Sequence, residues 1–166
     1  MKKTFLLIIF QFSIIYNCTG QKLQLWFFPS FHNYSKMTIT SDSLNGSLRF
    51  DIFNGHDSST IIWTEEAHLN MAEYKSFDNF LSNYKYSFTN NVETDSTGQM
   101  ISVGTDGIDI YGNYYDGHKI NQFGFWSPHK KSTNHQLFKM SLDALKINLK
   151  DKRSKDYLKW LKMYLD

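Results

Sequence analysis

Polar and apolar residues alternate with the two-residue period of a β-strand over residues 36–40 and again over 48–52. Asn45-Gly46 stands between the two runs, and both residues tolerate the positive φ angles of a type I′ turn. This combination predicts a β-hairpin. In its second strand the alternation directs three side chains into the core: Leu48, Phe50 and Ile52.

Runs rich in β-branched and aromatic residues predict five further strands, over 23–28, 60–64, 100–103, 107–115 and 119–126. We expect Glu65-Glu66 to end the second of these. Turn residues at 104–107 and at Asp116-Gly117 connect the last three, which predicts a three-stranded meander. Ser127-Pro128 should end the sheet, because proline has no N–H to donate to a strand pair.

Apolar residues recur at helical spacing in three places. The first helix is expected over 77–86, with Ser76 as its N-cap. The second begins after Ser132 or Thr133 and reaches Leu149. The third begins after Ser154 and ends near the C-terminus.

These elements predict an α+β fold: an antiparallel sheet of about six strands, made of a hairpin and a meander, with a middle helix and two C-terminal helices packed on one face. The sequence contains no internal repeat and no linker rich in proline or glycine. We therefore expect residues 21–166 to form one domain.

The first twenty residues have the pattern of a secretory signal peptide. Lys2 and Lys3 precede an uncharged apolar run over 4–16, which is shorter than the roughly 20 residues that span a membrane. Cleavage is expected between Gly20 and Gln21, which would release a periplasmic or secreted protein.

The alternative for this segment is a lipoprotein signal, in which acylation of Cys18 anchors the domain to a membrane. Lipoprotein signals carry small residues before the cysteine, whereas Tyr16-Asn17 stand here. This favours soluble export, and we expect membrane association only if Cys18 is lipidated.

Removal of residues 1–20 changes the charge balance. The full chain has 18 basic and 16 acidic residues, and loss of Lys2 and Lys3 leaves 16 of each. A neutral domain lacks the positive field of nucleic-acid binding proteins, so DNA and RNA are not expected partners. The only cysteine is Cys18, so the mature chain would contain no disulfide and no catalytic thiol.

No motif for catalysis or for a cofactor stands out. A Glu-x-x-His unit, Glu65 to His68, occurs once and outside a four-helix pattern, so no metal is expected. There is no Gly-x-Ser-x-Gly elbow and no phosphate-binding loop. Nothing selects a glycosidase pair from the candidate carboxylates, which are Glu65, Glu66, Glu73, Asp106, Asp109 and Asp116. The sequence leans against an enzyme without deciding the question.

Aromatic residues make up 17% of the chain, and several fall in the predicted meander. Alternation along 111–115 sends Tyr111 and Tyr115 to one side and Tyr114 to the other. One of these sets, together with Trp126 on the next strand, should face away from the core, where exposed rings mark contact with a protein or a sugar. The candidate binding residues are Tyr111, Tyr114, Tyr115 and Trp126.

The sequence therefore favours an exported, non-catalytic binding protein without a cofactor. The expected partner is a protein of the cell envelope, engaged as an inhibitor or immunity-type protein engages its target. The alternative is a cell-envelope enzyme or carbohydrate-binding module that acts on a saccharide or on peptidoglycan.

Overall fold

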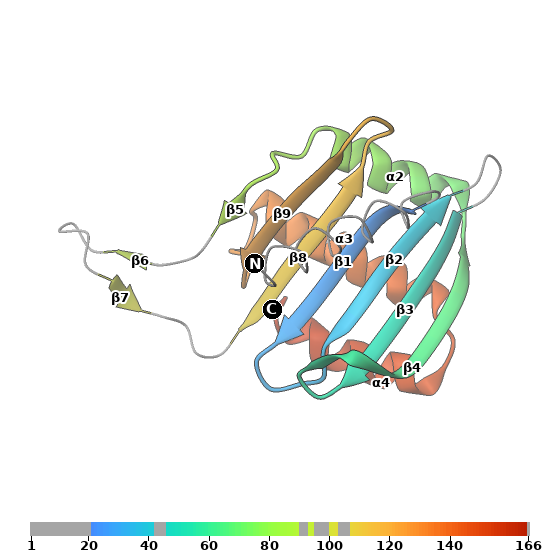
Figure 1. The fold of residues 1–166 in the computed structure, drawn as a ribbon, viewed down its shortest axis with the longest axis horizontal. Helices are drawn as coiled ribbons and strands as arrows, with labels where there is room; N and C mark the ends of the chain where they lie inside the picture. The colour runs from blue at the N-terminus through green and yellow to red at the C-terminus, as the bar shows by residue number, and fades with distance from the viewer. Residues whose placement is uncertain (1–20, 42–45, 90–92, 95–99, 103–106, 166) are drawn as a thin grey trace, which may run out of the picture.

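The computed structural model describes residues 21–41, 46–89, 93–94, 100–102 and 107–165. Its main sheet has the strand order β4-β3-β2-β1-β8-β9-β5 (Figure 1). The strands are β1 (Gln21–Pro29), β2 (Ser35–Ser41), β3 (Gly46–Asn54), β4 (Asp57–Leu69), β5 (Phe88–Thr89), β8 (Ile108–Tyr115) and β9 (Ile120–Trp126). The helices are α2 (Met71–Ser82), α3 (Thr133–Asn148) and α4 (Lys152–Lys162).

The predicted α+β fold is confirmed. Six strands pair in antiparallel fashion, and the two-residue β5 adds to β9 in parallel. The middle helix and the two C-terminal helices all lie behind the sheet in the view of Figure 1, so they cover one of its faces.

The hairpin of β2 and β3 is confirmed by its register, in which Met37 lies opposite Phe50 and Ile39 opposite Leu48. Leu48 and Phe50 are fully buried and Ile52 nearly so, as the alternation predicts. Asn45 lies outside the described residues. Gly46 is the first residue of β3, pairs with Ser41 and has no positive φ, so the predicted type I′ turn at Asn45-Gly46 was wrong.

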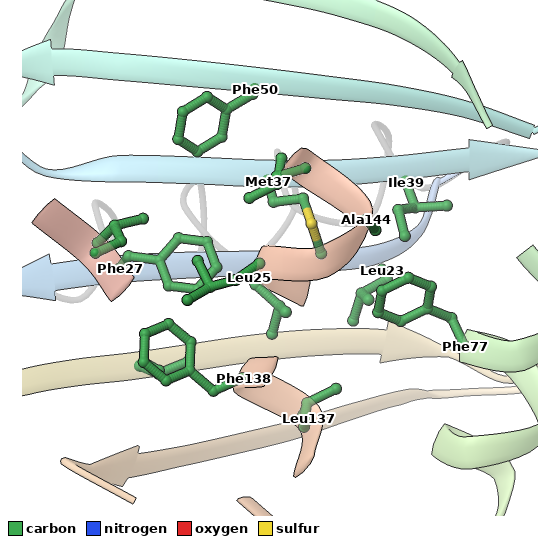
Figure 2. Packing of buried hydrophobic residues seen from close by; sticks show 14 of the residues in the cluster. Leu23, Leu25, Phe27, Met37, Ile39, Phe50, Phe77, Leu137, Phe138 and Ala144 are labelled. Atoms are coloured by element: carbon green, nitrogen blue, oxygen red, sulfur yellow. The ribbon is translucent and has the colours of Figure 1, made fainter. Parts of the chain in front are cut away.

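The core lies between the sheet and the helices (Figure 2). Alternate residues of β1 supply Leu23, Leu25 and Phe27, all buried. Helix α3 covers them, and its Phe138 ring lies 5.9 Å from the ring of Phe27. The opposite side chains of β1 must therefore point away from the helices.

Helix α2 begins six residues earlier than its apolar spacing predicted and ends at Ser82. Asn70, not Ser76, is the N-cap: its side chain accepts a hydrogen bond from the Glu73 N–H at 2.9 Å and donates one to the Glu73 carboxylate at 2.7 Å. This reciprocal pairing gives the Glu73 N–H, at the start of the helix, a hydrogen-bond acceptor. The helix therefore begins before the apolar periodicity that starts at Phe77.

Two strand predictions were wrong in part. Strand β4 continues through Glu65-Glu66 to Leu69, because its residues pair with β3 along that length. The predicted meander holds only for β8 and β9, since β7 (Met100–Ser102) pairs with β6 (Glu93–Thr94) in a separate two-stranded sheet. Both edges of β8 are already occupied, by β1 and β9.

The third helix is capped by Asp151 rather than Ser154, and the second by Ser132 as predicted. Asp151 accepts a hydrogen bond from the Arg153 N–H at 2.7 Å. Ser154 lies inside α4, where its buried hydroxyl accepts a hydrogen bond from the Trp63 indole at 3.0 Å.

Glu65 is an acidic residue of β4 whose side chain points toward the helices, where it has hydrogen-bond partners. Its carboxylate accepts hydrogen bonds from the backbone N–H groups of Lys150 and Asp151, at 2.6 and 3.0 Å, in front of helix α4. Burial raises the pKa of Glu65, but these bonds, one from Ser154 and the charge of Lys155 lower it below its usual value overall. The carboxylate thus stabilises the start of α4 in its charged form.

We expect Glu65→Ala to lower the free energy of unfolding by about 1 kcal/mol at neutral pH, because two backbone N–H groups lose their acceptor. Since the folded pKa is depressed, this stabilisation is present above the unfolded pKa and is lost as the pH falls through the folded pKa. Urea unfolding at neutral and acidic pH measures both effects. Glu66→Ala, on the opposite side of the same strand, is the control, and an equal loss in both variants would refute this role.

Candidate functional site

The face of the sheet opposite the helices, here called the outer face, carries rows of side chains that run across the strands. Residues in register on neighbouring strands point to the same face. One row crosses β8, β1, β2, β3 and β4, and consists of Tyr111, Trp26, Lys36, Asp51 and Thr64. It alternates along β1 with the core residues Leu25 and Phe27, which places it on the outer face.

Five aromatic rings on this face touch one another and form what we call the aromatic patch: Trp26, Phe28, Tyr34, Phe53 and Tyr111. Trp26 stacks on Phe53 with centroids 5.2 Å apart. Phe28 meets Tyr34 and Tyr111 edge to face, at 4.6 and 5.7 Å. Tyr111 is 43% exposed, and the other rings range from half-buried to buried.

The charged groups beside the aromatic patch neutralise one another. The fully buried Asp51 carboxylate accepts hydrogen bonds from Arg49 Nε at 2.9 Å and from the Thr64 hydroxyl at 2.7 Å, and Lys36 Nζ lies 3.5 Å from it. The same Lys36 ammonium lies 4.9 Å from the centre of the Trp26 ring. The Lys36 ammonium thus contacts both the Asp51 carboxylate and the Trp26 ring.

Asp109 lies at the other margin of the aromatic patch, in register with Phe28 on β1 and with Trp126 on β9. Among the described residues, no hydrogen-bond donor or cation contacts its carboxylate. Burial raises the pKa of Asp109, and burial together with the Asp109 charge raises the pKa of Tyr111. This carboxylate is therefore half-buried without compensation from the described residues.

Gly107 makes room for the Trp126 ring just before β8 begins. A Cβ atom on Gly107 would lie 2.4 Å from Cζ2 of the Trp126 indole, so only glycine leaves room for the ring. The indole therefore lies over Gly107, two positions before Asp109, which is the partner of Trp126 in register.

A row of polar side chains bounds the aromatic patch toward the far end of the strands. It consists of Gln122, Asn113, Gln24, Thr38, Arg49 and Glu66. Tyr115 lies beyond this row, where its hydroxyl donates to the Gly117 carbonyl at 2.7 Å. Tyr115 shares the outer face but not the aromatic patch.

The four predicted binding residues therefore separate. Tyr111 belongs to the aromatic patch, Trp126 lies beyond Asp109 on the neighbouring strand β9, and Tyr115 lies apart from the patch. Tyr114 points to the opposite face, as the alternation predicted, and is 3% exposed. Its hydroxyl donates to Asp78 at 2.7 Å, and its pKa is raised, by burial above all, to about 12. Burial removes Tyr114 from the candidate surface.

Sequence reasoning missed four rings of the aromatic patch: Trp26, Phe28, Tyr34 and Phe53. The signal for two of them was present in β1, where Trp26 and Phe28 alternate with the core residues of that strand. Tyr34 and Phe53 give no such signal. Phe53 follows a register shift in the pairing of β3 with β4, which sequence alternation does not predict.

The candidate carboxylates that the structure describes do not gather into a catalytic pair. Glu65 and His68 sit three positions apart on a strand, so they point to opposite faces. Glu66 pairs with Arg49 at 3.4 Å, and Glu73 serves the start of α2. Asp116 closes the turn before β9, where hydrogen bonds from Lys119, Asn121 and His118 lower its pKa to about 2. Asp106 lies outside the described residues.

Within the described ranges, no three His, Cys, Asp or Glu side chains gather as metal ligands do. None of the described helices is long and apolar enough to cross a membrane. Cys18 and Gly20 lie outside the described residues, whereas Gln21 is the first residue of β1. Cleavage and lipidation therefore stay predictions.

No protein-family model matches this chain. Comparison with curated proteins and with solved structures likewise found no match.

Proposed function

We propose that this chain is an exported, non-catalytic binding protein that engages another protein through the aromatic patch. The observation that carries the proposal is the contiguity of the five rings on the face that the helices leave uncovered, where Tyr111 of β8 is 43% exposed. Aromatic clusters of this kind supply most of the binding energy at protein interfaces.

The orientation of the rings favours a protein over a saccharide as the partner. A sugar-binding platform presents its rings in one plane, so that they stack on the faces of the sugar. Here Phe28 and Phe53 lie within 12° and 28° of parallel to Trp26, but Phe28 meets Tyr34 and Tyr111 at interplanar angles of 77° and 74°. Rings that pack edge to face form a compact apolar surface, and such a surface suits contact with the side chains of a protein partner.

Export is part of the proposal and has its own measurement. Intact mass of the protein from its native host should match the chain from Gln21 to Asp166. A mass that corresponds to acylated Cys18 would instead place the domain at a membrane surface.

The binding role is tested by capture from the cell-envelope fraction of the native host, followed by affinity measurements with the purified partner. We expect Tyr111→Ala and Phe28→Ala to weaken the affinity at least about tenfold, because central aromatic residues dominate such interfaces. Circular dichroism should show that both variants stay folded.

Trp160→Ala is the matched control, since Trp160 is a 48% exposed aromatic residue on α4, in the helical layer. Equal binding by wild type and Tyr111→Ala would contradict the proposal. So would retention of the protein on peptidoglycan without any protein partner, which would favour the saccharide alternative.

A further inference from the structure

Among the described residues, two carboxylates of the outer face lie beside aromatic residues, and one of these carboxylates has a described cation next to it. Asp51 faces Lys36, whose ammonium lies 4.9 Å from the centre of the Trp26 ring and 5.7 Å from that of Phe53. Asp109 lies between Phe28 and Trp126 in the sheet, yet no described residue brings a cation to it. Asp109 thus resembles Asp51 in having aromatic residues nearby, but it lacks a cation like Lys36 among the described residues.

The surroundings of Asp109 are suited to a positively charged side chain. Phe28 and Trp126 flank Asp109 in register, and Tyr111 follows two positions along β8 with its ring 5.7 Å from Phe28. Ring faces attract a cation through their quadrupole, and a half-desolvated carboxylate attracts it by charge. Neutral and anionic groups are attracted neither by the ring faces nor by the carboxylate in this way.

The uncompensated carboxylate is also unfavourable for the protein alone. Burial raises the pKa of Asp109, which means that the folded state disfavours its charged form. A partner cation would remove this penalty on binding, so the site gains more from a cation than a solvated surface carboxylate does.

We propose that Asp109, with Phe28, Tyr111 and Trp126 around it, receives a lysine or arginine side chain of the protein partner. This inference rests on the proposed function, because it specifies the chemistry that the aromatic patch recognises. Lysine and arginine both carry the required positive charge. The experiment below tests each side chain separately.

The test uses the purified exported protein labelled with ¹⁵N and two probes, N-acetyl-arginine amide and N-acetyl-lysine amide. We expect one or both to shift the Trp126 indole N–H resonance with an affinity on the order of millimolar, a scale that suits a single side chain. N-acetyl-norleucine amide, which lacks the charge, should leave the resonance in place. The indole signals of Trp63 and Trp160 serve as internal controls.

Asp109→Asn is the decisive variant. It should abolish the response of Trp126 to both probes and weaken binding of the purified partner about tenfold or more. Its thermal midpoint at neutral pH should equal or exceed that of the wild type, because no half-buried charge is left. A lower midpoint would indicate a structural carboxylate and would overturn the inference.

The outcomes separate this inference from the proposed function. Partner binding that is lost in Tyr111→Ala but unchanged in Asp109→Asn would refute the cation site and leave the proposed function standing. Partner binding unchanged in both variants would refute the proposed function as well. An equal response to norleucine amide would show that the site recognises apolar bulk rather than charge, which also overturns the inference.

Discussion

Phe123→Ala is expected to lower the free energy of unfolding by about 3–5 kcal/mol, because it opens a cavity in a core that has little freedom to collapse. Phe123 is fully buried, and its ring lies 5.1 Å from that of Tyr84 and 5.7 Å from that of Tyr86. These tyrosines follow helix α2, so Phe123 joins β9 to the middle of the chain. Urea unfolding followed by circular dichroism measures the loss.

Gly112 provides a sharper test of the same contact. A Cβ atom on Gly112 would lie 2.1 Å from Cζ of Phe123, and the rings around Phe123 leave it no room to move. We therefore expect Gly112→Ala to cost about 1–3 kcal/mol in the wild type. In a Phe123→Leu background the same change should cost little, because the ring that meets the new methyl group is gone.

The double-mutant cycle of Gly112 and Phe123 should thus show strong non-additivity, as expected for residues in direct contact. Additive losses would show that the ring does not lie over the glycine. The β8 and β9 pairing would then need another explanation for its glycine in the middle of a strand.

The second large effect is expected for Asp51→Ala, with a loss of about 2–3 kcal/mol. The carboxylate is fully buried and binds Arg49, Thr64 and Lys36 at once. Its removal leaves the Thr64 hydroxyl without its acceptor and the two cations without their shared counter-charge. Because Arg49 and Lys36 both reach solvent in part, the loss stays below that of a fully buried ion pair.

Asp143→Ala is the matched control for Asp51→Ala. Asp143 also forms an ion pair, with Lys139 at 2.6 Å, but both side chains are more than half exposed on α3. Water screens such pairs, so we expect a change of at most about 0.5 kcal/mol. Chemical denaturation of both variants, at low and at high salt, measures the difference, and equal losses would contradict the role assigned to burial.

The local patterns in the sequence predicted the fold class well. Alternation over 48–52 correctly assigned the core side of β3, and helical spacing correctly predicted a helix that begins after Ser132. These patterns work because each strand or helix must bury one side against the rest of the protein. The ends of the elements were less predictable. Strand β4 runs on to Leu69 through its pairing with β3, and the local pairing of Asn70 with Glu73 starts α2 before the apolar spacing begins.

The candidate site was only partly accessible from the sequence. Tyr111 and Trp126 were identified by alternation, but the same pattern did not show that Tyr114 would be covered by α2 and bound to Asp78. It also did not show which rings would meet, because Trp26, Phe53 and Tyr111 come from three strands that are distant in sequence.

The class of the fold, most of its strands and helices and the core side of β3 thus follow from the amino-acid sequence, because they depend on local periodicity. Tertiary contacts, in contrast, set which charges are neutralised and which aromatic residues neighbour each carboxylate. Lys36 reaches Asp51 while Asp109 has no described cation, and this difference depends on the order and register of the strands in the sheet. Strand order is set by the packing of the whole domain, and so it cannot be derived from any one segment.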